Sequence, residues 1–238
     1  MSQPQKKKAE AKPRKRRSRK DLGEKGLVSR ENILKAARRV FAKVPFPNAT
    51  MRMIGSEGGF EHPLVHYYFP TKADLFDAVM AEICEELAAA NESWFSGLSS
   101  DDVRGGWSIF LDRVIAWCVE NPEPFRIIFL NMAEFQRVED LPGLSRIPGL
   151  MDRTREVFLA ALPVPLPENE VKIFNNVIAN MLICFLGADL CHAMIVGMEP
   201  LSEQYRQWVK STLLYLFLPW TESLIQKALA DMAGGAKG

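Results

Sequence analysis

Residues 50 to 72, TMRMIGSEGGFEHPLVHYYFPTK, have the spacing of a helix-turn-helix that is followed directly by a new helix start. Thr50 is a suitable cap for a short first helix, in which Ile54 lies on the apolar side. Gly55 supplies a small residue where a second helix must cross closely. Gly59 offers the positive φ that a tight turn between two helices requires. The stretch therefore predicts two short helices joined at Gly59.

The second short helix is expected from about Glu61 to Phe69, with Pro63 tolerated in its first turn. Helical spacing turns Val65 and Phe69 inward and leaves the remaining side chains facing outward. A recognition helix lies in the major groove with its early residues on base edges. The residues expected to contact bases are His62, Pro63, Leu64 and His66.

A further helix is expected to begin after Phe69-Pro70, where Thr71 and Asp74 have the spacing of a capping box. Its apolar stripe continues to about Trp94 or Phe95. Lys72 stands at its N-terminus, where the helix dipole favours anions rather than cations. A phosphate partner is therefore the expected reason for this lysine.

Residues 29 to 76 resemble the DNA-binding domain of the TetR family of transcriptional regulators, and the resemblance covers about a fifth of the chain. The matching positions are Ile33, Leu34, Ala36, Ala37, Phe41 and Ala42, then Ala49, Thr50, Ile54, Gly59 and Phe60, then Leu64 to Lys72, Leu75 and Phe76. The chain departs from the family pattern at Pro45, at Met53 and at Glu61-His62-Pro63. Because the last three open the recognition helix, relatives do not give the operator sequence.

The resemblance implies an all-α fold with an N-terminal three-helix, helix-turn-helix DNA-binding domain and a C-terminal helical domain for ligand binding and dimerisation. Thr50, Tyr67, Tyr68 and Lys72 resemble the phosphate-binding positions of the family, and hydroxyl and ammonium groups suit that role. With Arg52 and the base-contact candidates they complete the expected DNA-binding set. The partners implied are a double-stranded DNA operator, a small-molecule effector and a second copy of the chain.

The near-neutral net charge of +1 conceals a strong asymmetry. Residues 1 to 30 hold 12 of the 30 Lys and Arg residues and three of the 29 acidic residues, so about +9 lies on this segment and about −8 on the rest. We expect residues 1 to 28 to be a disordered basic arm, because they bury too little to order themselves. Such an arm adds salt-dependent, sequence-blind affinity for DNA, by tracking phosphates or by entering a minor groove.

The chain beyond the recognition unit is expected to be helical, and we place the domains at residues 29 to 80 and 81 to 238. The helices are expected at Trp107 to Val119, Pro122 to Val138, Leu150 to Leu162, Glu168 to Val196 and Leu201 to Ala233. The resemblance implies that the last two form a four-helix bundle with the partner. Val177 to Met198 is long enough to cross a bilayer, but Asn180, Asp189 and His192 are costly there.

The remaining side chains leave two alternatives to a regulator. A scaffold or membrane-associated protein would use the basic arm on anionic lipids, and an α-helical enzyme would need a nucleophile with its base, of which there is no sign. His62 and His66 have metal-pair spacing without an evident third ligand, so neither a metal nor a cofactor is expected. The four cysteines lack paired spacing, which predicts reduced, buried thiols in a cytoplasm.

The function expected is that of a ligand-responsive repressor, which binds a palindromic operator as a dimer. Aromatic and methionine side chains on the C-terminal helices favour an apolar or amphipathic effector. The residues that bind it are not identifiable from the sequence. Polar residues in an apolar context, each equally suited to a buried hydrogen bond or a dimer contact, are Gln136, Asn180, Asp189 and His192.

Overall fold

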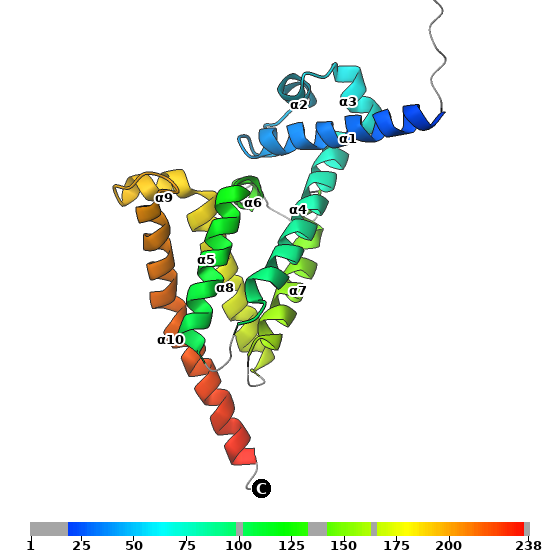
Figure 1. Ribbon diagram of the computed structural model, residues 1–238. Coiled ribbons are helices and arrows are strands. Elements are labelled where there is room, and N and C mark those ends of the chain that lie inside the picture. The colour runs from blue at the N-terminus through cyan, green and yellow to red at the C-terminus, as the bar shows by residue number, and fades with distance from the viewer. Residues whose placement is uncertain (1–18, 99–101, 133–141, 163–165, 236–238) are drawn as a thin grey trace, which may run out of the picture.

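The computed structural model describes residues 19–98, 102–132, 142–162 and 166–235, and all regular elements in this part of the chain are helical. Figure 1 shows α1, α2 and α3 grouped at one end, with α4 running from them into a bundle. The all-α fold is as predicted. The elements are α1 (Arg19–Phe41), α2 (Met51–Gly58), α3 (His62–Tyr68), α4 (Lys72–Phe95), α5 (Val103–Glu120), α6 (Glu123–Met132), η2 (Leu144–Arg146), α7 (Ile147–Ala160), α8 (Glu168–Gly187), α9 (Asp189–Ile195) and α10 (Glu203–Gly235).

The first helix begins earlier than the sequence suggests. α1 starts at Arg19, so the disorder predicted for residues 19 to 28 is wrong. This segment lacks a regular apolar stripe, yet its Lys, Arg, Glu and Leu residues are good helix formers. Extending an existing helix also costs less than nucleating one. The rest of the predicted arm, residues 1 to 18, lies outside the described residues.

The bundle is held by aromatic side chains from α5, α8 and α10. Trp107, Phe174 and Phe217 pack with ring centroids 5.5–6.1 Å apart. Two buried polar groups add directional contacts. The Trp107 Nε1–H donates to the Thr221 hydroxyl at 3.0 Å, and the Tyr205 hydroxyl donates to the Phe185 carbonyl at 2.7 Å. These bonds satisfy polar groups that would otherwise destabilise the core.

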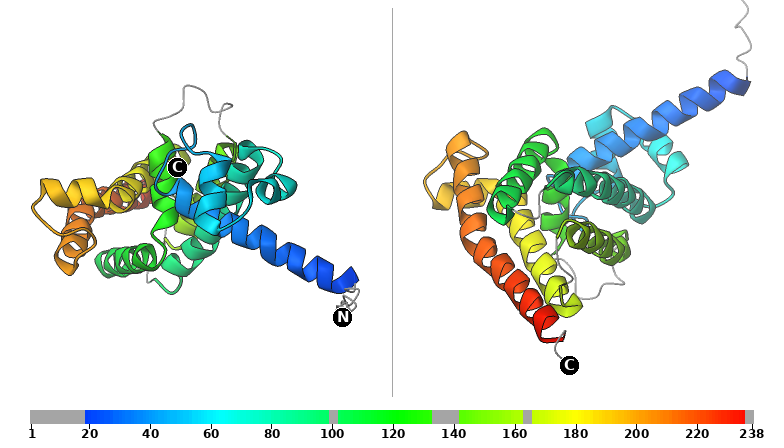
Figure 2. Two further views of the ribbon diagram at one scale, coloured as in Figure 1. Left: turned by 90° about the horizontal axis from the view of Figure 1, so that it is seen from above. Right: turned by 60° about the horizontal axis from the view of Figure 1, so that its bottom comes forward.

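The predicted helix from Glu168 to Val196 is instead two helices. α8 ends at Gly187 and α9 begins at Asp189, with Ala188 between them at φ −116° and ψ 30°. Glycine is a poor helix former, and the Asp189 carboxylate is favourable at the new N-terminus. The apolar run from Val177 to Met198 is therefore divided between two directions, as Figure 2 shows.

One helix in the described part of the chain, α8, is long and apolar enough to cross a membrane by length and composition alone. Core helices of globular proteins have the same length and composition. Within the most apolar 18-residue stretch of α8, 44% is buried. Its buried face includes Phe174 and Leu182, which belong to the main apolar core. We therefore describe α8 as a core helix.

The described cysteines form no disulfide, but they are not all buried. Cys84 and Cys118 are buried, and burial raises the pKa of both thiols. Cys184 on α8 is half-buried and Cys191 on α9 is exposed, so the prediction of four buried thiols is wrong at these two positions.

Candidate DNA-binding interface

The turn between α2 and α3 has the geometry that its glycines predict. Gly59 lies in the left-handed region at φ 69°. At Gly55, an added Cβ would lie 2.9 Å from the Phe60 carbonyl oxygen, so a side chain there would displace the turn. The Thr50 hydroxyl accepts a hydrogen bond from the Met53 N–H at 3.2 Å, which confirms it as the cap of α2.

The third helix is held by one apolar side chain and leaves an exposed face. Val65 is fully buried, and Phe69 just beyond the helix is nearly so. The four residues predicted to contact bases are all exposed, as is Tyr67, which is 78% exposed. This face is the candidate surface for base contacts, and its exposed residues are His62, Pro63, Leu64, His66 and Tyr67.

His62 and His66 form a hydrogen-bonded pair on this face. The Nδ1 of His66 lies 3.1 Å from the Pro70 carbonyl oxygen, and its Nε2 lies 3.2 Å from the Nε2 of His62. A carbonyl only accepts, so His66 Nδ1 must donate, and in the neutral ring Nε2 then accepts from His62. The His62 Nδ1 is consequently left as an acceptor. No group of three or more metal-binding side chains occurs among the described residues.

The candidates for phosphate contact lie around this surface. Thr50 and Arg52 are exposed at the start of α2. Tyr68 is half-buried and packs edge-on against Tyr67 at a centroid separation of 5.0 Å. The capping box predicted at the start of α4 is present, because the Thr71 hydroxyl accepts from the Asp74 N–H while the Asp74 carboxylate accepts from the Thr71 N–H. The N-terminus of α4 is thereby fixed beside α3.

Lys72 has protein partners that the sequence did not indicate. Its Nζ donates to the carbonyl oxygens of Phe46, Pro47 and Ala49 at 2.6, 3.1 and 2.9 Å. It also lies 4.4 Å from the centroid of the Phe46 ring. A lysine ammonium has three donors, so all of them are in use here. Burial lowers the pKa of Lys72. A phosphate contact stays a prediction, and it requires one of these bonds to open.

We expect Lys72→Ala to lower the free energy of unfolding by about 2 kcal/mol, because three carbonyls of the loop between α1 and α2 lose their donor. Denaturant unfolding of the isolated protein measures this loss. If Lys72 also binds a phosphate, the slope of log K against log salt concentration will fall by about one. An unchanged stability would show that the three hydrogen bonds contribute nothing, whatever happens to the slope.

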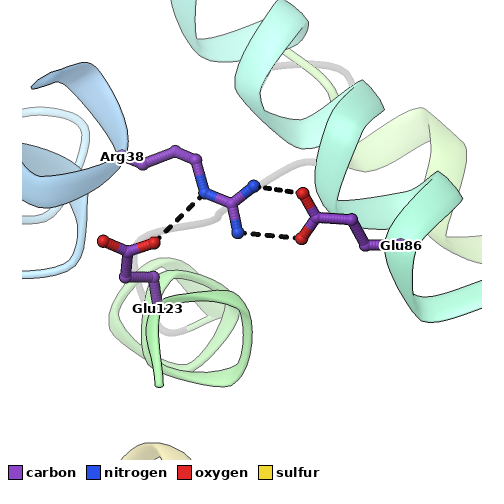
Figure 3. A network of polar contacts seen from close by, with 3 residues as sticks. All are labelled: Arg38, Glu86 and Glu123. Carbon is purple, nitrogen blue, oxygen red and sulfur yellow. Dashed lines mark hydrogen bonds and ion pairs between the residues drawn. The ribbon is translucent and has the colours of Figure 1, made fainter. Parts of the chain in front are cut away.

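An ion-pair network joins the DNA-binding end to the bundle, as Figure 3 shows. The guanidinium of Arg38 on α1 forms a two-pronged contact with Glu86 on α4, and its Nε lies 3.3 Å from Glu123 on α6. The second contact is within ion-pair distance but is not aligned as a hydrogen bond. Burial opposes the charge on Arg38, but Glu86 and the nearby carboxylates outweigh it and raise its pKa.

Helix α6 makes two further contacts with the DNA-binding end. The Nε of Arg126 donates to the Ala42 carbonyl at 3.1 Å, and its Nη1 donates to the Gly187 carbonyl at 3.2 Å. The side-chain carbonyl of Asn131 accepts from the Phe46 N–H at 2.8 Å. α6 is therefore tied to α1, to the loop after it and to the end of α8. The sequence analysis missed these residues, because their partners lie 61 to 85 positions away.

A cavity of about 330 Å³ lies within the bundle, and α4, α5, α6, α7 and α8 all contribute to its wall. Its lining is mainly apolar and aromatic, and includes Trp94, Phe110, Ile128 and Phe158. The polar residues in the wall are Asn91, Thr154, Asn175, Asn176 and Asn180. The volume and lining are those of a small-molecule site.

Of the polar residues that the sequence suggested as ligand contacts, only some lie at the cavity. Asn180 lines the cavity, whereas Asp189 faces Arg126 at 4.0 Å and His192 packs against Phe185 at a centroid separation of 5.2 Å. Gln136 lies outside the described residues. Asn175 was missed, although two adjacent asparagines in an apolar helix were a visible signal.

An exposed recognition helix on a helix-turn-helix, joined to a helical bundle, defines this chain as a DNA-binding transcriptional regulator. The comparisons agree with that class. The family model described as bacterial regulatory proteins, tetR family, matches residues 33–79. The chain is 28% identical over 192 residues to YdgC of Bacillus subtilis (strain 168), named as an uncharacterized HTH-type transcriptional regulator, with 76% of this chain and 98% of the relative covered.

Solved structures extend the likeness to the whole fold. A tetR-family transcriptional regulator from Streptomyces coelicolor is similar with a TM-score of 0.56 at 18% identity, covering 85% of this chain and 89% of that one. A TetR-family regulator from Agrobacterium tumefaciens is similar with a TM-score of 0.58 at 14% identity, covering 80% and 97%. These findings support a TetR-family regulator, with the family match at residues 33–79 and the fold shared over most of the chain.

Proposed function

We propose that this regulator is a ligand-responsive repressor that binds a palindromic operator as a homodimer and loses that affinity when an effector occupies the bundle. The observation that carries the proposal is the pairing of an exposed recognition helix with an internal cavity: α3 is followed directly by α4, and α4 lines the cavity. The proposed function is that of a DNA-binding protein in the cytoplasm and not that of an enzyme. Nothing in the described residues favours the membrane-associated or scaffold alternative over it.

The DNA contacts are assigned to α3 and its surroundings. His62, Pro63, Leu64 and His66 face the bases, and the Leu64 side chain is suited to a thymine methyl group. The Nδ1 of His62 is suited to accept from the amino group of an adenine or cytosine, because its other nitrogen is used within the histidine pair. Phosphate contacts come from Thr50, Arg52, Tyr67, Tyr68 and Lys72, and the basic segment at residues 1 to 28 adds sequence-blind attraction.

Dimerisation is assigned to the outer faces of α8 and α10, the last two long helices. Support comes from exposed apolar side chains, which are unfavourable on a free surface when they gather on neighbouring helices. Ile173 and Val177 on α8 and Tyr215, Leu216, Leu229 and Met232 on α10 are exposed in the single chain. A two-fold axis through such an interface relates the two recognition helices and accounts for a palindromic operator.

The effector is assigned to the cavity, and α6 is assigned the transmission of its binding. α6 contributes Phe125, Ile128 and Met132 to the cavity wall, and the same helix holds Glu123 beside Arg38 and Asn131 beside the loop at Phe46. A ligand that moves α6 therefore acts directly on the position of α1. By reciprocity, an inducer that weakens DNA binding must itself bind less tightly to the DNA complex.

Arg38→Leu is expected to weaken this coupling and to lower the free energy of unfolding by about 1–2 kcal/mol. The substitution leaves Glu86 and Glu123 without their cation, and both are about one-third exposed, which reduces the penalty from that of a fully buried pair. Arg39→Leu is the matched control, because Arg39 pairs with Glu57 on the surface within the DNA-binding end. Equal losses in the two variants would contradict a special role for Arg38.

Selection of bound sequences from a random duplex pool at physiological salt tests the function. We expect enrichment of a palindrome, with the full chain preferring it over scrambled DNA by a factor of ~10³ or more. Binding without enrichment would leave only sequence-blind attraction and would favour the membrane or scaffold alternative. An enriched sequence without two-fold symmetry would contradict the dimer.

A further inference from the structure

The cavity is lined by an asparagine whose amide donor has no partner among the described residues. Asn175 on α8 is 5% exposed, and its Nδ2 has almost no accessible surface and no hydrogen-bond acceptor there. Buried donors are almost always paired, and the terminal torsion of an asparagine turns readily, so this amide can present its donor to a ligand that supplies the acceptor. In the same part of the chain the Nε atoms of Arg38 and Arg206 also lack a hydrogen-bond partner, but these residues do not line the cavity.

The amide donors of Asn91 and Asn180 and the hydroxyl of Thr154 already have partners within the protein. The Asn91 Nδ2 donates to the Thr154 hydroxyl at 3.0 Å, and that hydroxyl donates to the Leu150 carbonyl at 3.0 Å. The Asn180 Nδ2 donates to the backbone carbonyl and to the side-chain oxygen of Asn176 at 2.7 and 3.0 Å. These bonds hold Asn91 and Asn180 in place, whereas Asn175 is left as the donor for a ligand.

The wall carries no charged residue within the described part of the chain, and no histidine there lines the cavity. A carboxylate or ammonium group placed inside it would lose hydration without gaining a counter-ion from the described wall. A neutral carbonyl, ester or hydroxyl loses much less and gains the bond from Asn175. The rest of the wall is aromatic and aliphatic, so it is suited to a hydrocarbon body.

We propose that the effector is an uncharged, largely apolar molecule with one hydrogen-bond acceptor, which the Asn175 side-chain amide binds within the cavity. The inference rests on the proposed function, because it names the chemical class of the effector of that same site. It assigns specificity to a single side chain of α8. The face of α8 that carries Ile173 and Val177 is the one assigned to the dimer, so an acceptor bound at Asn175 lies on the helix that joins the two protomers.

The test uses direct binding of four molecules of one chain length to the full-length protein. Displacement of a solvent-sensitive apolar dye would measure the affinities of decan-2-one, decane, decanoate and decylamine. We expect decan-2-one to bind most tightly, with the two ions at least ~100-fold weaker, because an unpaired buried ion costs several kcal/mol. Tight binding of either ion, or no binding by any of the four, would overturn the proposal.

Asn175→Leu separates the hydrogen bond from the apolar contacts. It is expected to lower the affinity for decan-2-one by roughly three- to tenfold while leaving that for decane unchanged or slightly higher. Asn180→Leu is the matched control, because it lines the same cavity from the same helix but its amide already has partners. An equal loss for both ketone and decane in Asn175→Leu, or equal effects of the two variants on the ketone, would contradict the assignment.

Asn175→Ala gives a second test if the leucine variant does not fold. It removes the amide donor without adding another polar group, so the advantage of decan-2-one over decane is expected to shrink by roughly three- to tenfold. Retention of the ketone preference would overturn the role of Asn175. These measurements do not involve DNA. If the ketone binds as expected but leaves operator binding unchanged, the class of ligand stands and the proposed regulation fails.

Discussion

Replacing Phe76 by alanine is expected to lower the free energy of unfolding by about 3–5 kcal/mol. Phe76 is fully buried on α4 and packs edge-on against Phe41 of α1 at a centroid separation of 4.8 Å. It also contacts Phe46, in the loop held by Lys72, at 4.9 Å. Truncation therefore removes the side chain that joins α1, this loop and α4. Domains commonly have only 5–15 kcal/mol of stability in total, so operator binding is expected to be lost with the fold.

Denaturant unfolding of the purified variant measures this effect. Ile109→Ala is the control, because Ile109 on α5 is a large apolar side chain that is 44% exposed. Its truncation is expected to cost less than about 1 kcal/mol. A loss below about 1 kcal/mol for Phe76→Ala would mean that the three rings do not hold the DNA-binding end together.

His62→Ala is expected to weaken binding to the selected operator by about 1–3 kcal/mol, which is roughly fivefold to 150-fold, and to relax specificity at one base position. The reason is the acceptor left at His62 Nδ1 once the Nε2 is engaged by His66. Affinity for scrambled DNA is expected to change little, since that binding depends on phosphate contacts. Titration of operator and scrambled duplexes with each variant measures both quantities.

Operator binding by the His66→Ala variant tests whether the hydrogen bond between His62 and His66 matters for DNA recognition. The substitution frees the Nε2 of His62 and removes the link to the Pro70 carbonyl, so the His62 ring loses its fixed orientation. If the two histidines act as one unit, the double variant will lose much less than the sum of the single losses. Additive losses would show that each ring contacts the DNA independently. Met53→Ala on the exposed side of α2 controls for a general surface effect.

The DNA-binding end was predictable because its signals are local. Thr50 and Thr71 act on backbone groups within three positions, and Gly59 is required by its own φ. The bundle contacts were not predictable, because Arg38 meets Glu86 across 48 positions without any pattern in the sequence. Lys72 illustrates both cases. Its unusual place at a helix N-terminus was visible, but the three carbonyls that explain it come from 23 to 26 positions away.

Helical spacing also did not predict which apolar side chains of the C-terminal part are buried. Met194 lies in the apolar run from Val177 to Met198, yet it is 73% exposed on α9. Asn175 shows the reverse case, since a polar residue at a buried helical position leaves no periodic signal. Both errors concern α8 and α9, whose surroundings depend on the break at Ala188. Residue spacing alone does not predict that break.

Helix α4 runs from the recognition unit to the cavity without glycine or proline between Lys72 and Phe95. Its 24 residues span about 36 Å, at ~1.5 Å of rise per residue. An uninterrupted rod of that length turns a small rotation into a large displacement, because a tilt of about 5° moves its far end by about 3 Å. Successive major grooves on one side of B-DNA are ~34 Å apart, and the two recognition helices of the proposed dimer would have to match that period together. In that dimer, a rearrangement in the cavity that tilts α4 by this small angle would shift a recognition helix by about a tenth of the groove spacing.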